Sequence, residues 1–172
     1  LVTDTLGEKD LVTIYVGLHN ILQGYERLAT SDEATITASL QGQGKTLGEQ
    51  VNRVAQTGAP VLVVTVPNVG DSPFGRAQQT ATPGRAALLG RLTSSFNIAM
   101  RLEIINDGRL VGLVDAFDLT RAAVTAPSLF LLTNIIDASC AAATPTPDCS
   151  TATLAQVGGA TASATGFMWA DS

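Results

Sequence analysis

The run Val61-Leu-Val-Val-Thr-Val66 decides the fold class of this chain. It is short, rich in β-branched residues, and apolar at nearly every position rather than at every second one. Two further runs, Leu11–Val16 and Leu110–Val114, share this pattern. Continuous apolar runs of this length are typical of parallel strands that are covered on both faces. The sequence therefore predicts three buried parallel strands.

A helical pattern precedes the second run. Thr46–Thr57 places three apolar side chains on one face of a helix. Thr46 and Glu49 have the spacing of a capping box at its start, and Gly58 follows as a C-terminal stop. Since strand and helix patterns alternate along the 172 residues, we predict one doubly wound α/β domain spanning residues 1–172.

Further segments are assigned in the same way. Arg85–Asn106 carries apolar residues at helical spacing and ends in an Asn-Asp-Gly turn, and Asp118–Val124 is compatible with a short helix. Thr30–Gly44 is rich in Gly and Gln, and Ser139–Gly166 is rich in Ala, Thr and Gly. We predict flexible loops for both.

Composition excludes several classes of protein. Hydrophobic residues make up 45% of the chain and charged residues 15%, which excludes intrinsic disorder. The net charge is −5 and there is no basic block, so we expect no nucleic-acid partner. No apolar stretch is long enough to span a membrane. One His and two Cys cannot build a His- or Cys-rich metal site, so we expect no metal.

The two cysteines, Cys140 and Cys149, enclose an irregular spacer that contains two prolines. This spacing suits neither a C-x-x-C redox motif nor a zinc pair. We predict a disulfide that closes a short surface loop, which implies a secreted or periplasmic protein, and two free thiols are the alternative.

In parallel sheets, ligands bind beyond the carboxyl ends of the strands, so the residues that follow the three runs are candidate site residues. They are Gly17–Asn20, Pro67–Ser72 and Asp115. We interpret Asp115 as a helix N-cap or loop residue and Asn68 as a turn residue.

Four segments resemble a known family. Asp10–Leu22 resembles the third conserved block of the SGNH/GDSL hydrolases, a strand followed by Gly-x-Asn-Asp. Gly58–Gly70 is similar to the next helix-to-strand passage, which ends in Pro-x-x-Gly. Phe117–Cys140 resembles the stretch before the last block, and Phe167–Asp171 resembles the start of that block, Asp-x-x-His. The resemblance covers nearly the whole chain and is closest to the secreted phospholipase/lecithinase/hemolysin-like branch.

This resemblance implies a three-layer α/β/α sandwich with a mainly parallel sheet. It also implies hydrolysis of a small-molecule or lipid ester without metal or organic cofactor. In the family, a Ser in an N-terminal Gly-Asp-Ser block attacks the ester carbonyl. A His in the last block takes its proton, and the Asp three residues before that His orients the imidazole.

The family's site residues carry over in part. Asp171 stands at the position of the triad Asp, and Gly17 matches the third block. His19 stands where the family has the oxyanion Asn, and Asn20 stands where it has the Asp. Either Asn20 takes the oxyanion role by a one-residue shift, or the His19 imidazole donates instead, or the substitution weakens the oxyanion hole. We expect Gly17–Asn20 and Asp171 to border one pocket.

Gly70-Asp71-Ser72 spells the family's nucleophile tripeptide, but it follows the Gly-x-Asn-Asp-like block instead of preceding it. Pro67 and Pro73 flank it, which favours a turn rather than a helix start. We therefore interpret Ser72 as a loop residue, and a nucleophilic Ser72 is the alternative. We also expect Trp169 to pack in the core.

The family's nucleophilic Ser, its basic His and its first strand have no counterpart in residues 1–172, and the chain begins with Leu1 rather than Met. We therefore expect the central and C-terminal part of an SGNH/GDSL ester hydrolase, inactive on its own. The alternative is a non-catalytic secreted remnant that acts as a binding or surface module.

Overall fold

The structure is a computed structural model, and it describes residues 5–105, 108–141 and 148–170. It is a mixed α/β structure, as predicted. The chain divides into two compact units. Unit 1 comprises Leu1–Pro67 and Arg91–Phe117, and unit 2 comprises Asn68–Gly90 and Asp118–Ser172.

Three strands form the sheet of unit 1. They are β1 (Val12–Ile14), β2 (Val61–Val64) and β3 (Val111–Val114), in the order β1-β2-β3. Both pairings are parallel, and Val61 lies opposite Val12 on one side and Val111 on the other. The three predicted parallel strands are therefore confirmed, although each is shorter than its apolar run.

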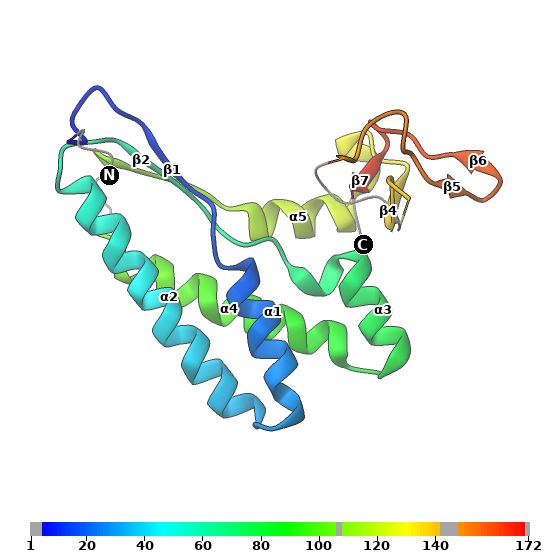
Figure 1. The fold of residues 1–172 in the computed structure, drawn as a ribbon, viewed down its shortest axis with the longest axis horizontal. Helices are drawn as coiled ribbons and strands as arrows, with labels where there is room; N and C mark the ends of the chain where they lie inside the picture. The colour runs from blue at the N-terminus through cyan, green and yellow to red at the C-terminus, as the bar shows by residue number, and fades with distance from the viewer. Residues whose placement is uncertain (1–4, 106–107, 142–147, 171–172) are drawn as a thin grey trace. The chain divides into compact units, whose positions relative to one another are not determined.

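The helices of unit 1 lie between these strands in the chain. They are α1 (Leu18–Glu26), a 3-10 turn (Arg27–Ala29), α2 (Glu33–Ala55) and the larger part of α4 (Arg85–Glu103). Figure 1 shows β1 and β2 side by side, with α2 and α4 on the same side of them. The helix predicted over Arg85–Asn106 is confirmed over Arg85–Glu103 as α4, and residues 106 and 107 of the predicted turn lie outside the described residues.

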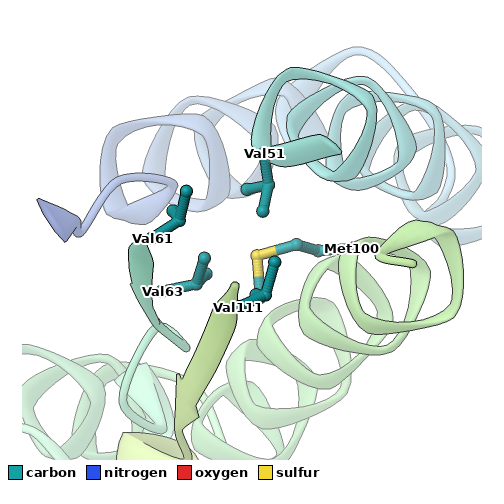
Figure 2. Packing of buried hydrophobic residues seen from close by; sticks show 5 residues of the cluster. All are labelled: Val51, Val61, Val63, Met100 and Val111. Carbon is teal, nitrogen blue, oxygen red and sulfur yellow. The ribbon is translucent and has the colours of Figure 1, made fainter. Parts of the chain in front are cut away.

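The core of unit 1 lies where α2 and α4 meet the sheet (Figure 2). Val51 comes from α2, Met100 from α4, and the strands contribute Val61, Val63 and Val111. All five are at most 8% exposed. Burial of such side chains is the main favourable term in folding, so this cluster holds the sheet against both helices.

The opposite face of the sheet is more open. Strand neighbours in register point to the same face, which places Thr13, Gly112 and Val114 opposite the core. All three are exposed, Val114 by 37%. Cover on both faces of β1 and β3 is therefore not shown in the described part of unit 1 and stays a prediction. The described part of unit 1 shows a parallel sheet with helices against one face.

The largest departure from the sequence prediction is helix α2, which spans Glu33–Ala55. The flexible loop predicted over Thr30–Gly44 is wrong, because most of it belongs to this helix. The capping box predicted at Thr46 is also wrong, since Thr46 is interior and its hydroxyl donates to the Gly42 carbonyl at 3.0 Å. Asp32 caps the helix instead, and its carboxylate accepts from the Thr35 N–H at 2.7 Å.

Two of the glycines that favoured a loop have a packing role. A Cβ at Gly44 would collide with the Phe96 carbonyl of α4. A Cβ at Gly48 would lie 2.8 Å from the Met100 carbonyl. The four-residue spacing puts both glycines on one face of α2, which lets the backbones of α2 and α4 approach closely. Gly44 and Gly48 therefore form part of the packing contact between α2 and α4.

Unit 2 contains the first residues of α4, most of α5 (Ala116–Thr125) and several short elements. A 3-10 turn (Val69–Asp71) leads into α3 (Pro73–Ala81), and a second 3-10 turn, η3 (Pro127–Phe130), follows α5. Strand β4 (Asn134–Ala138) pairs in parallel with β7 (Phe167–Trp169). The short helix predicted over Asp118–Val124 is confirmed within α5.

The loop predicted over Ser139–Gly166 is only partly correct. It contains an antiparallel hairpin of β5 (Gln156–Val157) and β6 (Ala160–Thr161). Gly158 and Gly159, both at positive φ, form the two-residue turn between these strands. Two-residue hairpin turns need this conformation, which glycine adopts without a steric penalty.

The predicted disulfide is present. Cys140 and Cys149 are bonded, with Cα atoms 5.8 Å apart. The alternative of two free thiols is therefore wrong.

Candidate functional site at the carboxyl ends of the strands

The carboxyl ends of β1, β2 and β3 lie at one edge of the sheet because the strands are parallel. Gly17 follows β1, Thr65 and Val66 follow β2, and Asp115 follows β3. All belong to unit 1. This edge is where an α/β protein places its ligands, so it is the candidate site.

Gly17 makes the turn from β1 into α1. It is buried, and its φ of +118° lies in the region that favours glycine. A Cβ here would also collide with the Phe96 ring and come within 2.9 Å of the Val66 side chain. Packing and backbone conformation therefore both require glycine at position 17.

The N-terminus of helix α1, which starts after Gly17, presents backbone N–H groups to this edge. Gly17 is its N-cap and has no side chain to satisfy the first backbone N–H groups, and no acidic residue stands in the first turn. The intrahelical bonds begin with the Ile21 N–H, which donates to the Gly17 carbonyl at 3.1 Å. Such an end carries partial positive charge and suits a developing oxyanion.

His19 and Asn20 lie in that first turn and differ in their surroundings. His19 is exposed, and the described part of the chain offers its imidazole no hydrogen-bond partner. Asn20 is half-buried, and its Nδ2 donates to the Gln43 Oε1 of α2 at 2.9 Å. One amide N–H of Asn20 is thus held by α2, whereas the imidazole of His19 is available to a ligand.

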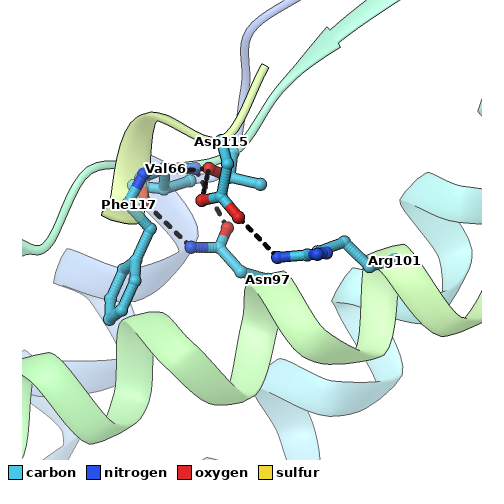
Figure 3. Close-up of polar contacts among 6 residues, drawn as sticks. Val66, Asn97, Arg101, Asp115 and Phe117 are labelled. Carbon is cyan, nitrogen blue, oxygen red and sulfur yellow. Dashed lines mark hydrogen bonds and ion pairs between the residues drawn. The ribbon is translucent and has the colours of Figure 1, made fainter. Parts of the chain in front are cut away.

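A polar network fixes the other two strand ends (Figure 3). Thr65, 1% exposed, donates to Asp115 Oδ1 at 3.3 Å and accepts from the Phe117 N–H at 3.0 Å. Arg101 of α4 pairs with Asp115 Oδ2 at 2.6 Å. Asp115 therefore tethers β3 and the start of α5 to β2 and α4. This favours the structural interpretation of Asp115 over a catalytic one.

Ser72 lies in unit 2 and caps α3. Its hydroxyl accepts from the Gly75 N–H at 3.1 Å and donates to the Val69 carbonyl at 2.7 Å. Pro73 occupies the first helical position, so the expectation that the prolines disfavour a helix start is wrong. Asn68 accepts from the Gly70 N–H at 3.1 Å, as expected of a turn residue.

Asp171, the candidate triad carboxylate, lies outside the described residues. The described chain reaches Ala170, just after β7. In β7, Trp169 is half-buried and its indole N–H donates to the Ile135 carbonyl at 3.0 Å. The expected closeness of Asp171 to Gly17–Asn20 stays a prediction.

A pocket of about 430 Å³ adjoins Asn20 in unit 1. Apolar side chains from Val16, Leu47 and Phe96 line it, together with the carboxamides of Asn20, Gln43 and Gln50. Its volume is in the range of small-molecule sites. Sequence reasoning missed Gln43 because Thr30–Gly44 was assigned to a loop, and it placed Leu47 and Gln50 on a helix without any signal that they line a pocket.

The described residues offer no cluster of three or more His, Cys, Asp or Glu side chains that could hold a metal ion. Within that same part of the chain, no helix has the length and apolar character needed to cross a bilayer.

Comparison with known proteins adds no relative. The chain matches no protein-family model, and a search of curated proteins finds no match.

Proposed function

We propose that this chain is part of a secreted, serine-dependent carboxylic ester hydrolase that resembles the SGNH/GDSL family. The observation that carries the proposal is the turn at Gly17. It joins a parallel strand to a helix whose N-terminal N–H groups lie at the carboxyl edge of the sheet. In the family, this position lines the oxyanion hole. We also propose that the natural protein has the three-layer α/β/α sandwich fold that this resemblance implies.

In the proposed reaction, a serine carried by residues that precede this segment attacks the ester carbonyl. A histidine that follows Asp171 takes the serine proton and passes it to the leaving alcohol, and Asp171 orients that histidine. The negative charge on the carbonyl oxygen develops near the first turn of α1. There, backbone N–H groups and the side chain of His19 or Asn20 donate to it.

Both candidate donors stay in the proposal. One Asn20 amide N–H donates to the Gln43 Oε1 at 2.9 Å, but the amide carries a second N–H, and the imidazole of His19 is exposed. The pocket beside Asn20 has no charged side chain in its lining, which suits a neutral acyl group or alcohol. The substrate is therefore proposed to be an uncharged small-molecule or lipid ester. The disulfide is compatible with an extracellular protein.

The test has two parts. First, the 172-residue chain is assayed with p-nitrophenyl acetate, and we expect no turnover above background because the nucleophile and base are lacking. Turnover that is lost in Ser72→Ala would make Ser72 the nucleophile and overturn the assignment.

Second, the natural protein that contains this sequence is assayed in the same way. We expect its coding sequence to carry Gly-Asp-Ser upstream and a His three residues after Asp171. Turnover should be lost when that serine is replaced by alanine.

A non-catalytic binding module is the second candidate function. The departures at His19 and Asn20 from the family's Asn-Asp favour it. A natural protein without the upstream serine and the following histidine, yet able to bind ester analogues, would support this function instead.

A further inference from the structure

Both cysteines of the disulfide contact the same carbonyl group. The Cys140 N–H donates to the Ala170 carbonyl at 2.9 Å, and the Cys149 Sγ lies 3.8 Å from that oxygen. Cys140 and Cys149 are bonded to each other. Ala170 directly follows the last residue of β7, so the disulfide lies where the chain leaves this strand. We refer to the two cysteines and their contacts with Ala170 as the β7 clamp.

The first half of the β7 clamp is held from two sides. Cys140, 3% exposed, forms an antiparallel bridge with Leu154. The residue before it, Ser139, donates from its N–H to the Trp169 carbonyl at 2.8 Å and accepts from the Ala155 N–H at 2.8 Å. The segment that carries Cys140 therefore has one neighbour in β7 and another in the chain just before β5.

The second half of the β7 clamp is fixed through Thr153. Its hydroxyl accepts from the Ser150 N–H at 2.8 Å, and its own N–H donates to the Ser150 carbonyl at 3.0 Å. Ser150 directly follows Cys149 in the sequence. The Thr153 carbonyl accepts from the Ala141 N–H at 3.1 Å, so Thr153 also bonds to the segment that carries Cys140. Hydrogen bonds therefore fix the backbone beside both cysteines.

Strand β7 needs such support because its own pairing is short. It has three residues, and within the described residues its only strand partner is β4. The register between these strands is irregular between Asn134 and Ala138. A pair of two short strands is marginally stable in water. A covalent bond at the strand end resists fraying better than backbone hydrogen bonds, because those can be exchanged for hydrogen bonds with water.

We propose that the β7 clamp is a positioning element of the candidate site, and that ester hydrolysis requires its disulfide to be closed. This inference rests on the proposed function, in which Asp171 orients the catalytic histidine. Asp171 directly follows Ala170 in the sequence, so the clamp acts on the peptide group that leads into this residue. A displacement of about 1 Å at a catalytic centre can cost about 100-fold in rate.

The chain carries its own reporter of the β7 clamp. Trp169 is the single tryptophan, and its indole N–H donates to the Ile135 carbonyl at 3.0 Å. The disulfide of the 172-residue chain is reduced with a phosphine, which takes the oxygen of a water molecule while two thiols form. We expect Trp169 emission to shift to longer wavelength and its acrylamide quenching constant to rise at least about twofold, because the end of β7 opens locally.

Two variants separate the clamp from a general loss of structure. The double variant Cys140→Ala, Cys149→Ala should show the emission of the reduced wild type, and the phosphine should not change it further. Gln156→Ala is the matched control in unit 2, because Gln156 donates to the Thr161 hydroxyl within the β5–β6 hairpin at 2.9 Å. Its emission should equal that of the oxidised wild type. The helical circular dichroism should change little on reduction, because α1 and α2 belong to unit 1.

The role in catalysis is measured with p-nitrophenyl butyrate and the natural protein that contains this sequence. The double cysteine variant should lose about 10–100-fold in kcat with little change in KM, because it misplaces a catalytic group and not the substrate. In an Asp171→Asn background, the same cysteine substitutions should cause no further loss of kcat. A disulfide that only stabilises the fold would lower kcat in both backgrounds.

The outcomes that contradict the inference differ from those that contradict the proposed function. Trp169 emission and quenching that stay unchanged after complete reduction, verified by thiol titration, would overturn the β7 clamp. Serine-dependent turnover with full kcat in the double cysteine variant, or a loss that adds to that of Asp171→Asn, would overturn only its role in catalysis. A natural protein without serine-dependent turnover would overturn the proposed function and that role together, whatever Trp169 shows.

Discussion

The side chain of Asn97 bonds both backbone polar groups of Val66. Its Oδ1 accepts from the Val66 N–H at 3.0 Å, and its Nδ2 donates to the Val66 carbonyl at 2.8 Å. Asn97 is 4% exposed and Val66 is 1% exposed. A carboxamide on α4 therefore completes the hydrogen bonding of the chain just beyond β2, where the backbone leaves the sheet.

Asn97→Leu should lower the free energy of unfolding by roughly 2–4 kcal/mol, because it leaves the N–H and carbonyl of Val66 buried without partners. Urea unfolding followed by circular dichroism measures the change. Gln41→Leu on the exposed surface of α2 is the control and should be nearly neutral. A loss below about 1 kcal/mol for Asn97→Leu would contradict this role.

Gly17→Ala should destabilise unit 1 by at least about 2 kcal/mol, since φ is +118° and the new Cβ meets the Phe96 ring and Val66. Gly42→Ala is the matched control, because a Cβ at this helical position has no atom within 4 Å. It should stabilise the chain by about 0.5–1 kcal/mol. Equal effects at both glycines would show that the turn at Gly17 is not tightly packed.

An ion pair between Glu33, at the start of α2, and Arg91 of α4 should make the stability depend on pH. Arg91 donates to Glu33 from Nε at 2.7 Å and from Nη2 at 3.0 Å, which lowers the pKa of Glu33. A carboxyl whose pKa is lower in the folded state adds stability above its unfolded pKa. That stability is lost as pH falls through the folded pKa. The effect is small because both side chains are exposed.

The measurement compares Glu33→Gln with the wild type by urea unfolding at about pH 7 and at about pH 2.5. The variant should have the lower midpoint at neutral pH, and the difference between the two proteins should shrink in acid as the wild-type carboxyl takes up a proton. Glu26→Gln on the exposed end of α1 serves as the control. A difference that persists unchanged in acid would rule out the ion pair as its cause.

The disulfide should contribute about 2.5 kcal/mol, since it closes a loop between residues 9 positions apart in sequence. The double variant Cys140→Ala, Cys149→Ala should lose this amount in urea unfolding. Adding a reductant should lower the stability of the wild type but not of the variant. If full reduction left the stability of the wild type unchanged, the disulfide would not contribute to the free energy of unfolding.

The sequence predicted the elements whose apolar pattern matches their burial. The run Val61–Val66 became β2, and Arg85–Asn106 became α4, because each pattern reports contacts that the element makes with the core. The disulfide followed from the irregular spacer between Cys140 and Cys149. These features are local, and their physical cause is visible in the residues themselves.

The missed features depend on contacts between distant segments. Glycine favours a loop when it is considered alone, but Gly44 and Gly48 are required where α2 meets α4, a partner that lies more than forty residues along the chain. The carboxamide contact between Asn20 and Gln43 was missed for the same reason. Within the candidate site, Gly17 could be predicted because it follows the first apolar run and also matches the glycine of the Gly-x-Asn-Asp motif.

The most direct test of the ester-hydrolase account is the hydrolysis of p-nitrophenyl butyrate by the natural protein that contains this sequence, with Asp171→Asn. The account predicts that kcat falls by about 10³–10⁴-fold, because the catalytic histidine loses the carboxylate that orients it. Asp148→Asn, at an exposed aspartate beside Cys149, should leave kcat unchanged. An Asp171→Asn variant that keeps wild-type kcat would contradict the account.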